Sequence, residues 1–344
     1  MERPKQADVA KLAGVSRATV SYVLSGRAGG AIAVADETRE RILAAAAELG
    51  YVPDAGAQSL KSGVTRMIGA TCPDLGNPHM WEILHGADMA TRAQGYDLNI
   101  ISTHLQYENE RGAIQQLLRR RLDGLLMTLT NAEQHHEDLK TLARRHSPVV
   151  ILGDYDHTIA DLDTVTPGHR EGAAQLMTHL LALGHRRISF LYGVASESFG
   201  RERLDTYFNT LRAAGVQPDD QLIEVCGVTT AQAYAAVQRI LARTPRPTAI
   251  VAINDQLAIG VLRAVADAGL RVPDDISVAG FDDIDLARFT VPALTTVKVM
   301  SDEIGQRAVA LIFDRLKDPN RPTQQITMPA QLAIRVSTGP VPGR

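Results

Sequence analysis

Short apolar runs alternate with longer amphipathic stretches along the chain from residue 66 onward. The short runs are rich in Val, Ile and Leu, as buried strands are, and the longer stretches have the period of a helix. The pattern predicts strands at 67–73, 99–102, 124–129 and 149–153, with helices at 78–94, 108–120 and 132–146. After His169 it repeats, with strands at 187–193, 222–226, 248–253 and 276–281, and helices at 169–183, 201–214, 231–242 and 255–268.

This alternation predicts an α/β fold. Short strands that alternate with helices form right-handed βαβ units and parallel sheets. Nearly continuous apolar strands fit sheets that helices cover on both faces. Because the pattern runs twice, we expect two doubly wound parallel-sheet subdomains with a cleft between them. Ligands of such sheets bind beyond the carboxyl ends of the strands, so the cleft is the expected ligand site.

The first 52 residues follow a different pattern, with three short helical stretches and no strand. In QADVAKLAGVSRATVSYVLSG, Gly14 supplies a tight turn between two of these stretches, and Ser16 can cap the second. Two helices joined by a short glycine turn form a helix-turn-helix, whose second helix enters the major groove of DNA. The apolar positions are Val9, Ala10, Leu12 and Ala13 in the first helix, and Val20, Val23 and Leu24 in the second.

The second helix carries side chains suited to DNA at its exposed start. Arg17 has the geometry to bind guanine O6 and N7, and neighbouring hydroxyl groups can bind phosphate. An ordinary helical hairpin is the alternative interpretation of the bare pattern. The DNA-binding candidates in this helix are Ser16, Arg17, Ala18, Thr19, Ser21 and Tyr22.

Composition excludes several classes of protein and of site, and it does not change the expected fold. Hydrophobic residues make up 45% and charged residues 22% of the 344 positions, a globular balance that excludes a disordered or fibrous chain. The formal net charge is −3, so any surface for nucleic acid must be local. Two cysteines are too few for a disulfide framework or a Cys-rich zinc site. No apolar run approaches the ~20 residues of a membrane span, and no signal peptide is visible, so we expect a cytoplasmic protein that binds no membrane.

The chain carries none of the short motifs that mark common catalytic sites. A Walker loop, a dinucleotide glycine fingerprint, HExxH and a nucleophile elbow are all missing from the sequence. His135 and His136 fall in a polar helix without a spaced third ligand, so we interpret them as solvated. A Ser–His–Asp arrangement assembled in space stays open, although nothing favours one. We therefore expect no enzyme, no cofactor and no metal ion.

The segments DVAKLAGVSRATVSYVLSG and TRERILAAAAELGYVPDAGAQSLKSG open the chain, and TAIVAINDQLAIGVLRAVADAGLRVPDDISVAGFDDIDLARFTVPALTTV comes later. These segments resemble LacI/GalR-type transcriptional repressors, and the resemblance covers nearly the whole chain. It implies a helix-turn-helix headpiece at 1–52, a hinge at 53–63 and a periplasmic-binding-protein-like core at 64–340. In that core we expect an N-subdomain at about 64–165 and 295–322, and a C-subdomain at about 166–294 and 323–340.

The resemblance also implies how the hinge meets DNA. In the family the hinge is a helix on operator DNA, where a Leu pair from two subunits wedges into the minor groove and bends the duplex. Leu60 matches that residue, and Gly56 and Ala57 match the small residues that let the hinge approach the groove. An ordinary apolar linker residue is the alternative for Leu60.

For the cleft, the resemblance implies binding of a small effector. A carboxylate and an arginine can bind the hydroxyls of a sugar, because charge-assisted hydrogen bonds are strong. Val228 stands where several family members stack an aromatic ring, so a nucleoside or another small polar metabolite stays open beside a sugar. The effector-binding candidates are His79, Met80, His104, Arg203, Asn254, Asp255 and Asp282.

These observations favour a homodimeric, ligand-responsive repressor that binds a near-palindromic operator in double-stranded DNA. We expect the effector to close or rotate the N-subdomains, separate the hinges and weaken DNA binding, whereas a corepressor would act with the opposite sign. A small-molecule binding protein without operator function is the first alternative. A sugar-processing enzyme is the second.

Overall fold

The computed structural model separates the chain into two compact units, Met1–Arg66 and Met67–Arg344, which we call the headpiece and the core. It describes residues 4–24, 34–52, 63–120, 122–130, 133–144, 148–153, 162–193 and 200–342. The described headpiece residues have a hydrophobic centre of their own, separate from the larger apolar clusters of the core.

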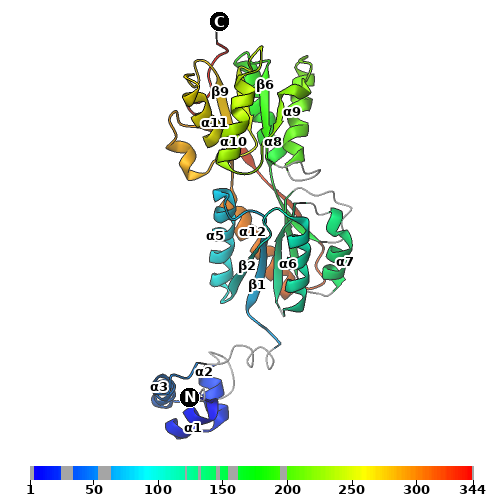
Figure 1. Ribbon diagram of the computed structural model, residues 1–344. Coiled ribbons are helices and arrows are strands. Elements are labelled where there is room, and N and C mark those ends of the chain that lie inside the picture. The colour runs from blue at the N-terminus through cyan, green and yellow to red at the C-terminus, as the bar shows by residue number, and fades with distance from the viewer. Residues whose placement is uncertain are drawn as a thin grey trace. The chain divides into compact units, whose positions relative to one another are not determined.

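Three helices, α1 (Gln6–Ala13), α2 (Arg17–Leu24) and α3 (Asp36–Glu48), make up the described headpiece (Figure 1). Helix α1 ends where Gly14 takes a left-handed conformation with φ 63°. The backbone N–H of Thr19 then donates to Ser16 Oγ over 3.1 Å, which caps the start of α2. The buried centre consists of Val9, Ala10, Ala13, Val20, Val23, Ile42, Ala45 and Ala46.

The expected apolar face of the first helix is wrong at Leu12, whose side chain is 47% exposed. Helix α1 has only eight residues and turns Val9, Ala10 and Ala13 toward the other two helices. Leu12 lies three residues after Val9 but on the side of Val9 away from Ala10 and Ala13, because each residue turns the helix by about 100°, so it falls outside that narrow stripe.

Two six-stranded sheets form the core, and we call the halves that they organise the N-subdomain and the C-subdomain. The N-subdomain sheet has the order β11-β5-β4-β3-β1-β2, and its pairings are parallel. The C-subdomain sheet has the order β12-β10-β9-β8-β6-β7, with an antiparallel edge pair, β10–β12. The expected two doubly wound sheets are thus confirmed. The strands are β1 (Met67–Cys72), β2 (Asp97–Ser102), β3 (Gly124–Thr128), β4 (Val149–Leu152), β5 (Asp163–Pro167), β6 (Ile188–Tyr192), β7 (Ile223–Val225), β8 (Ala249–Ala252), β9 (Ser277–Asp282), β10 (Thr295–Val299), β11 (Gln325–Met328) and β12 (Ala330–Ala333).

Helices cover both faces of each sheet (Figure 1). The tightest helix pair is α5 with α12 in the N-subdomain, where a Cβ on Gly86 would lie 2.0 Å from a backbone carbonyl of α12. None of the helices in the described part of the chain combines the length and apolarity that a membrane span requires. The helices are α5 (Pro78–Ala93), α6 (Tyr107–Arg119), η1 (Glu133–His135), α7 (His136–Arg144), α8 (His169–Ala182), α9 (Arg201–Ala213), η2 (Asp220–Leu222), α10 (Thr230–Leu241), α11 (Asp255–Asp267), η3 (Asp285–Arg288) and α12 (Ser301–Lys317).

The chain crosses between the two subdomains at β5–α8, at β10–α12 and at β11–β12. This path corrects the expected subdomain limits near the C-terminus. Strand β10 belongs to the C-subdomain sheet although it lies in 295–322, and β11 belongs to the N-subdomain sheet although it lies in 323–340. The sequence pattern did not reveal β11, because it is a half-exposed edge strand with alternating polar residues.

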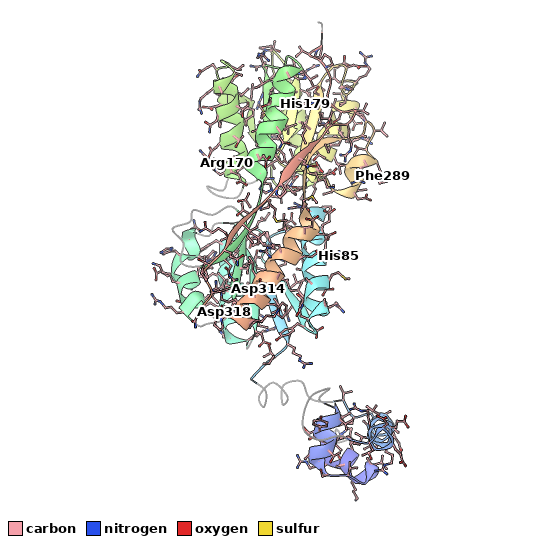
Figure 2. The ribbon with its side chains drawn as sticks, turned by 180° about the vertical axis from the view of Figure 1, so that it is seen from behind. His85, Arg170, His179, Phe289, Asp314 and Asp318 are labelled. Atoms are coloured by element: carbon pink, nitrogen blue, oxygen red, sulfur yellow. The ribbon has the colours of Figure 1, made fainter. Side chains whose placement is uncertain are left out.

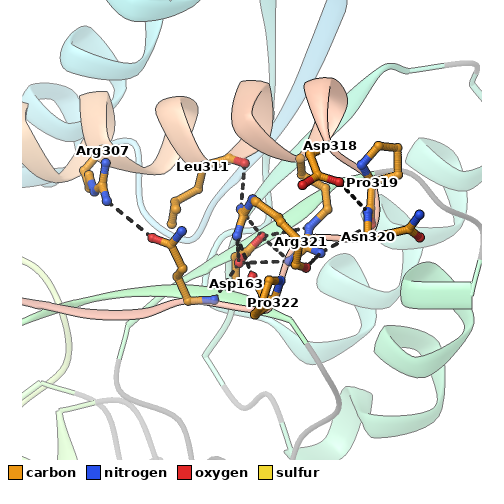
Figure 3. Close-up of polar contacts among 10 residues, drawn as sticks. Asp163, Arg307, Leu311, Asp318, Pro319, Asn320, Arg321 and Pro322 are labelled. Carbon is orange, nitrogen blue, oxygen red and sulfur yellow. Dashed lines mark hydrogen bonds and ion pairs between the residues drawn. The ribbon is translucent and has the colours of Figure 1, made fainter.

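A buried ion cluster in the N-subdomain holds the turn between α12 and β11 (Figure 3). Asp163 opens β5 and is only 2% exposed, and its carboxylate accepts from Arg321 over 2.7 Å and from Arg315 over 3.0 Å. The backbone N–H of Gln324 donates to the same carboxylate over 2.8 Å. These bonds hold the turn after α12 against β5, so that β11 can pair with β5 in parallel register.

Candidate DNA-recognition helix and effector pocket

The start of α2 presents polar side chains at the headpiece surface. Arg17 and Ala18 are exposed, as is the capping residue Ser16. Thr19, Ser21 and Tyr22 lie half-buried along the same helix, and the Thr19 hydroxyl lies 2.8 Å from Ser16 Oγ. The helix therefore buries Val20 and Val23 while its first turn stays accessible, as recognition by base-edge and phosphate contacts requires. The predicted hinge residues Gly56, Ala57 and Leu60 lie outside the described residues.

A pocket lies in the core where the carboxyl ends of strands from both sheets meet. Residues that directly follow β1, β3, β4, β6 and β8 line it, as the doubly wound fold predicts. Its wall is mostly aliphatic, with a few polar side chains. The predicted residues in the lining are His79, Met80, Arg203, Asn254 and Asp282.

Asp282 ends β9 and is the buried carboxylate of the pocket, 3% exposed. Its Oδ2 atom has no hydrogen-bond partner among the described residues. Burial raises the pKa of this carboxyl to about 7, because the charged form loses its hydration, while Arg203 and His169 oppose the increase. The group is thus an unsatisfied acceptor that faces the pocket, and a ligand donor would satisfy it.

Arg203 enters the pocket from α9 and is 5% exposed. Its Nη1 donates to the carbonyl of Ile253 over 2.8 Å, and its guanidinium carbon lies 5.5 Å from the centre of the Phe281 ring. The Nε atom of Arg203 has no partner within the described part of the chain, so a donor stays available beside Asp282. Gly200 opens the space for this arrangement, because a Cβ there would lie 2.5 Å from Ile253.

His79 closes the N-subdomain side of the pocket at the start of α5. Asn77 caps that helix by accepting from the His79 N–H over 3.0 Å. The imidazole Nδ1 lies 2.9 Å from the hydroxyl of Ser301, the first residue of α12. Burial lowers the pKa of His79 to about 4, because protonation would place an unhydrated charge there. His79 is therefore neutral at pH 7 and offers the pocket a polar but uncharged ring.

His104 and Asp255 do not lie in the pocket lining. His104 and Leu105 both have left-handed backbone angles, φ 53° and 56°, and this turn exposes His104 while Leu105 lines the pocket. Asp255 is fully buried behind the pocket, where its carboxylate accepts from the Thr296 hydroxyl over 2.6 Å and from the Ile284 N–H over 3.0 Å. Asn254, in contrast, lines the pocket and caps α11 by accepting from the Leu257 N–H.

The lining also contains a polar pair that the sequence pattern did not indicate, His169 and Glu202. Their side chains join the starts of α8 and α9, with 2.7 Å between His169 Nδ1 and Glu202 Oε1. His169 lies two residues after the end of β5, a strand that the pattern did not reveal. Had that strand been recognised, the residue at its carboxyl end would have been a candidate.

Comparisons with known proteins agree with this architecture. Residues 7–54 match a family profile described as bacterial regulatory proteins, lacI family, and residues 177–338 match a periplasmic binding protein-like domain. The HTH-type transcriptional repressor PurR of Photobacterium profundum is 33% identical over 330 residues, covering 96% of this chain and 97% of that protein.

Two solved structures extend the comparison. The lac repressor dimer bound to operator and the anti-inducer ONPF aligns with a TM-score of 0.84 at 28% identity, covering 98% of this chain and 100% of that one. The complex of the transcriptional regulator CelR with cellobiose aligns with a TM-score of 0.72 at 27% identity, covering 97% and 100%.

Proposed function

This chain belongs to the LacI family of bacterial transcriptional regulators, and we propose that it acts as a homodimer on a near-palindromic operator under the control of a small polar effector. Its DNA-binding repressor character follows from its relatives along nearly the full length. The effector class, the dimer and the operator symmetry are the parts that we propose. The observation that carries the effector is a pocket between two subdomains in which Asp282 Oδ2 and Arg203 Nε, both buried, have no hydrogen-bond partner among the described residues.

We propose a sugar as the effector. Its hydroxyls both donate and accept, so one ring can donate to Asp282 and accept from Arg203. The described lining offers no Phe, Tyr or Trp ring on which a flat base could stack. The related regulator CelR was solved with cellobiose, which supports a sugar in a pocket of this kind. Calorimetry with a panel of cellobiose, ribose, adenosine and guanine tests the class, and binding of only the purines would overturn the sugar assignment.

Two exposed apolar groups support a homodimer. Trp81 and Met89 are 51% and 55% exposed, and with His85 they lie at every fourth position of α5, hence on one face. Beyond η3, Phe289 and Val291 are 72% and 95% exposed. Figure 2 shows His85 and Phe289 on the same side of the core. Exposed apolar side chains gathered on one side are typical of an interface, and a two-fold axis would let one such surface pair with its copy.

Operator binding is tested by selecting random duplex DNA with the purified protein and sequencing the bound fraction. An enriched palindrome supports a dimer with one headpiece on each half-site. A single enriched half-site without symmetry would overturn the dimer proposal. Sedimentation of the wild-type protein beside Trp81→Glu provides the matched test, because a charge on that face should shift the population toward monomer.

A further inference from the structure

Strand β9 ends in a strained turn at the pocket. Asp282 and Asp283 follow each other with φ 104° and 58°, in the left-handed region that L side chains rarely adopt. Such conformations cost free energy, and they persist only where the surrounding structure holds them. The turn determines where the Asp282 carboxylate points.

Asp255, at the start of α11, holds this turn from behind. One carboxylate oxygen accepts from the backbone N–H of Ile284, the residue directly after the turn, over 3.0 Å. The other accepts from the hydroxyl of Thr296 on β10 over 2.6 Å. The N–H of Asp283 donates to that same hydroxyl over 3.4 Å. The carboxylate thus connects both sides of the turn to the neighbouring strand.

The strand is shaped around this carboxylate. A Cβ at Gly280 would lie 2.2 Å from Asp255 Oδ1, so β9 can pass the carboxylate only with glycine at that position. Asp255 is fully buried, and burial together with the nearby Asp282 carboxylate raises its pKa. Holding a buried acid beside a second acid costs free energy, because the charged form loses its hydration and like charges repel.

We propose that Asp255 is a positioning residue for the effector pocket: by bonding Ile284 and Thr296 it holds the strained turn that aims Asp282 at the ligand. The proposal rests on the proposed function only in that Asp282 contacts the effector. Asp255 itself touches no ligand, because it lies outside the pocket lining. Its role is therefore to orient the Asp282 carboxylate toward the pocket.

The test follows the titration of Asp282 by carboxyl ¹³C NMR in protein labelled at aspartate, with Asp282→Asn assigning the signal. Charged or titratable groups face Asp282 from other elements, namely Arg203 on α9, His169 on α8 and Glu82 on α5. These three stay in place in the variants Asp255→Ala, Asp255→Asn and Thr296→Val. The Asp255 carboxyl on α11 also faces Asp282 and is removed in both Asp255 variants, so Asp255→Asn reports the effect of its lost charge alone. The control is Asp285→Ala, which removes an exposed carboxylate from the adjacent η3.

We expect wild type, Asp255→Asn and the control to titrate alike, with the Asp282 pKa near 7. Asparagine can accept from the Ile284 N–H and donate to the Thr296 hydroxyl, so it should keep the turn. In Asp255→Ala the turn relaxes, Asp282 reaches water, and its pKa falls toward the ordinary value of 3.8. Thr296→Val should shift it in the same direction by a smaller amount.

An unchanged Asp282 titration in Asp255→Ala, with only a loss of stability, would show a structural role and overturn the proposal. Should that variant not fold, Thr296→Val decides, and a titration identical to wild type overturns the proposal equally. Neither DNA nor effector is present in this experiment. A failed operator selection would therefore count against the proposed function alone, and a failed titration shift against the role of Asp255 alone.

Discussion

Replacing His79 by Gln and Asp282 by Asn should change the pH dependence of core stability in opposite directions. Both side chains line the same pocket and are buried, but burial acts on opposite charge states. For an imidazole the charged form is the protonated one, whereas for a carboxyl it is the deprotonated one. The pKa of His79 therefore falls and that of Asp282 rises.

For His79 the pKa is about 4 in the folded protein against an ordinary 6.5. Above pH 6.5 the His79 imidazole is neutral in both the folded and the unfolded state, and its contribution to stability is fully present. As the pH falls from 6.5 to 4, the unfolded chain gains a proton that the folded protein does not bind. The core thereby loses about 3 kcal/mol across that window, and the His79→Gln variant should not show this loss.

For Asp282 the sign reverses, with a pKa of about 7 against an ordinary 3.8. Below pH 3.8 both states are protonated, and the folded protein buries a neutral carboxyl. As the pH rises to 7, the unfolded chain ionises first, so the core loses about 4 kcal/mol. Asp282→Asn should therefore be more stable than wild type at and above pH 7, a gain obtained by removing an unpaired buried acid.

The assay is urea unfolding at fixed protein concentration between pH 4 and pH 7, the window that the two pKa values define. Trp81 is the one tryptophan of the chain and belongs to helix α5 of the core unit, so its fluorescence reports on unfolding of that unit and not of the headpiece. At each pH the free energy of unfolding of wild type is subtracted from that of each variant, so the contributions of the other titratable groups cancel. Differences that stay flat across the window, or that slope in the same direction for both variants, would refute the reasoning.

Three further predictions concern packing and DNA binding. Asp163→Ala leaves two guanidinium groups without their buried partner and should lower the free energy of unfolding by about 3–5 kcal/mol, whereas the exposed Asp318→Ala should change it by less than about 1 kcal/mol in the same urea titration. Gly86→Ala forces a Cβ against a carbonyl 2.0 Å away and should cost about 3 kcal/mol or more, while Gly112→Ala, with open space on α6, should stabilise by about 0.5–1 kcal/mol in thermal unfolding. Arg17→Ala should weaken binding to the selected operator by about 1–3 kcal/mol, as measured by fluorescence anisotropy, and unchanged affinity would remove it from the recognition surface.

The parts of the fold that could be predicted from sequence are those in which burial dominates the pattern. Strand β3 reads GLLMT and β4 reads VVIL, and both are fully buried. Strand β5 reads DTVTP and escaped recognition, because its first residue is a buried acid whose partners come from α12 and the turn after it. No local pattern indicates that an aspartate is paired with arginines that lie more than 150 residues later in the chain.

The same limit applies to individual side chains. We interpreted His135 as solvated, and that is wrong, because the ring is fully buried. Its Nε2 lies 3.0 Å from Glu110 on α6, and the ring stacks on Tyr107 at 4.6 Å. In the pocket, the residues that match positions of the family resemblance were enough to find Asp282, Arg203 and His79. They could not distinguish Asp255, which supports the site from behind, from Asn254, which lines it.

Two polar residues of the pocket, His79 and His169, lie beside crossovers between the subdomains. His169 begins directly after the β5–α8 crossover, and a Cβ at Gly168 would lie 2.6 Å from the carbonyl of Met328 at the β11–β12 crossover. His79 contacts Ser301, the first residue after the β10–α12 crossover. A ligand that bonds both imidazoles therefore acts directly on residues at two of the crossovers, and on the third through Gly168. Since a ligand shifts a conformational equilibrium only by its difference in affinity for the two states, these are the contacts where such a difference can arise.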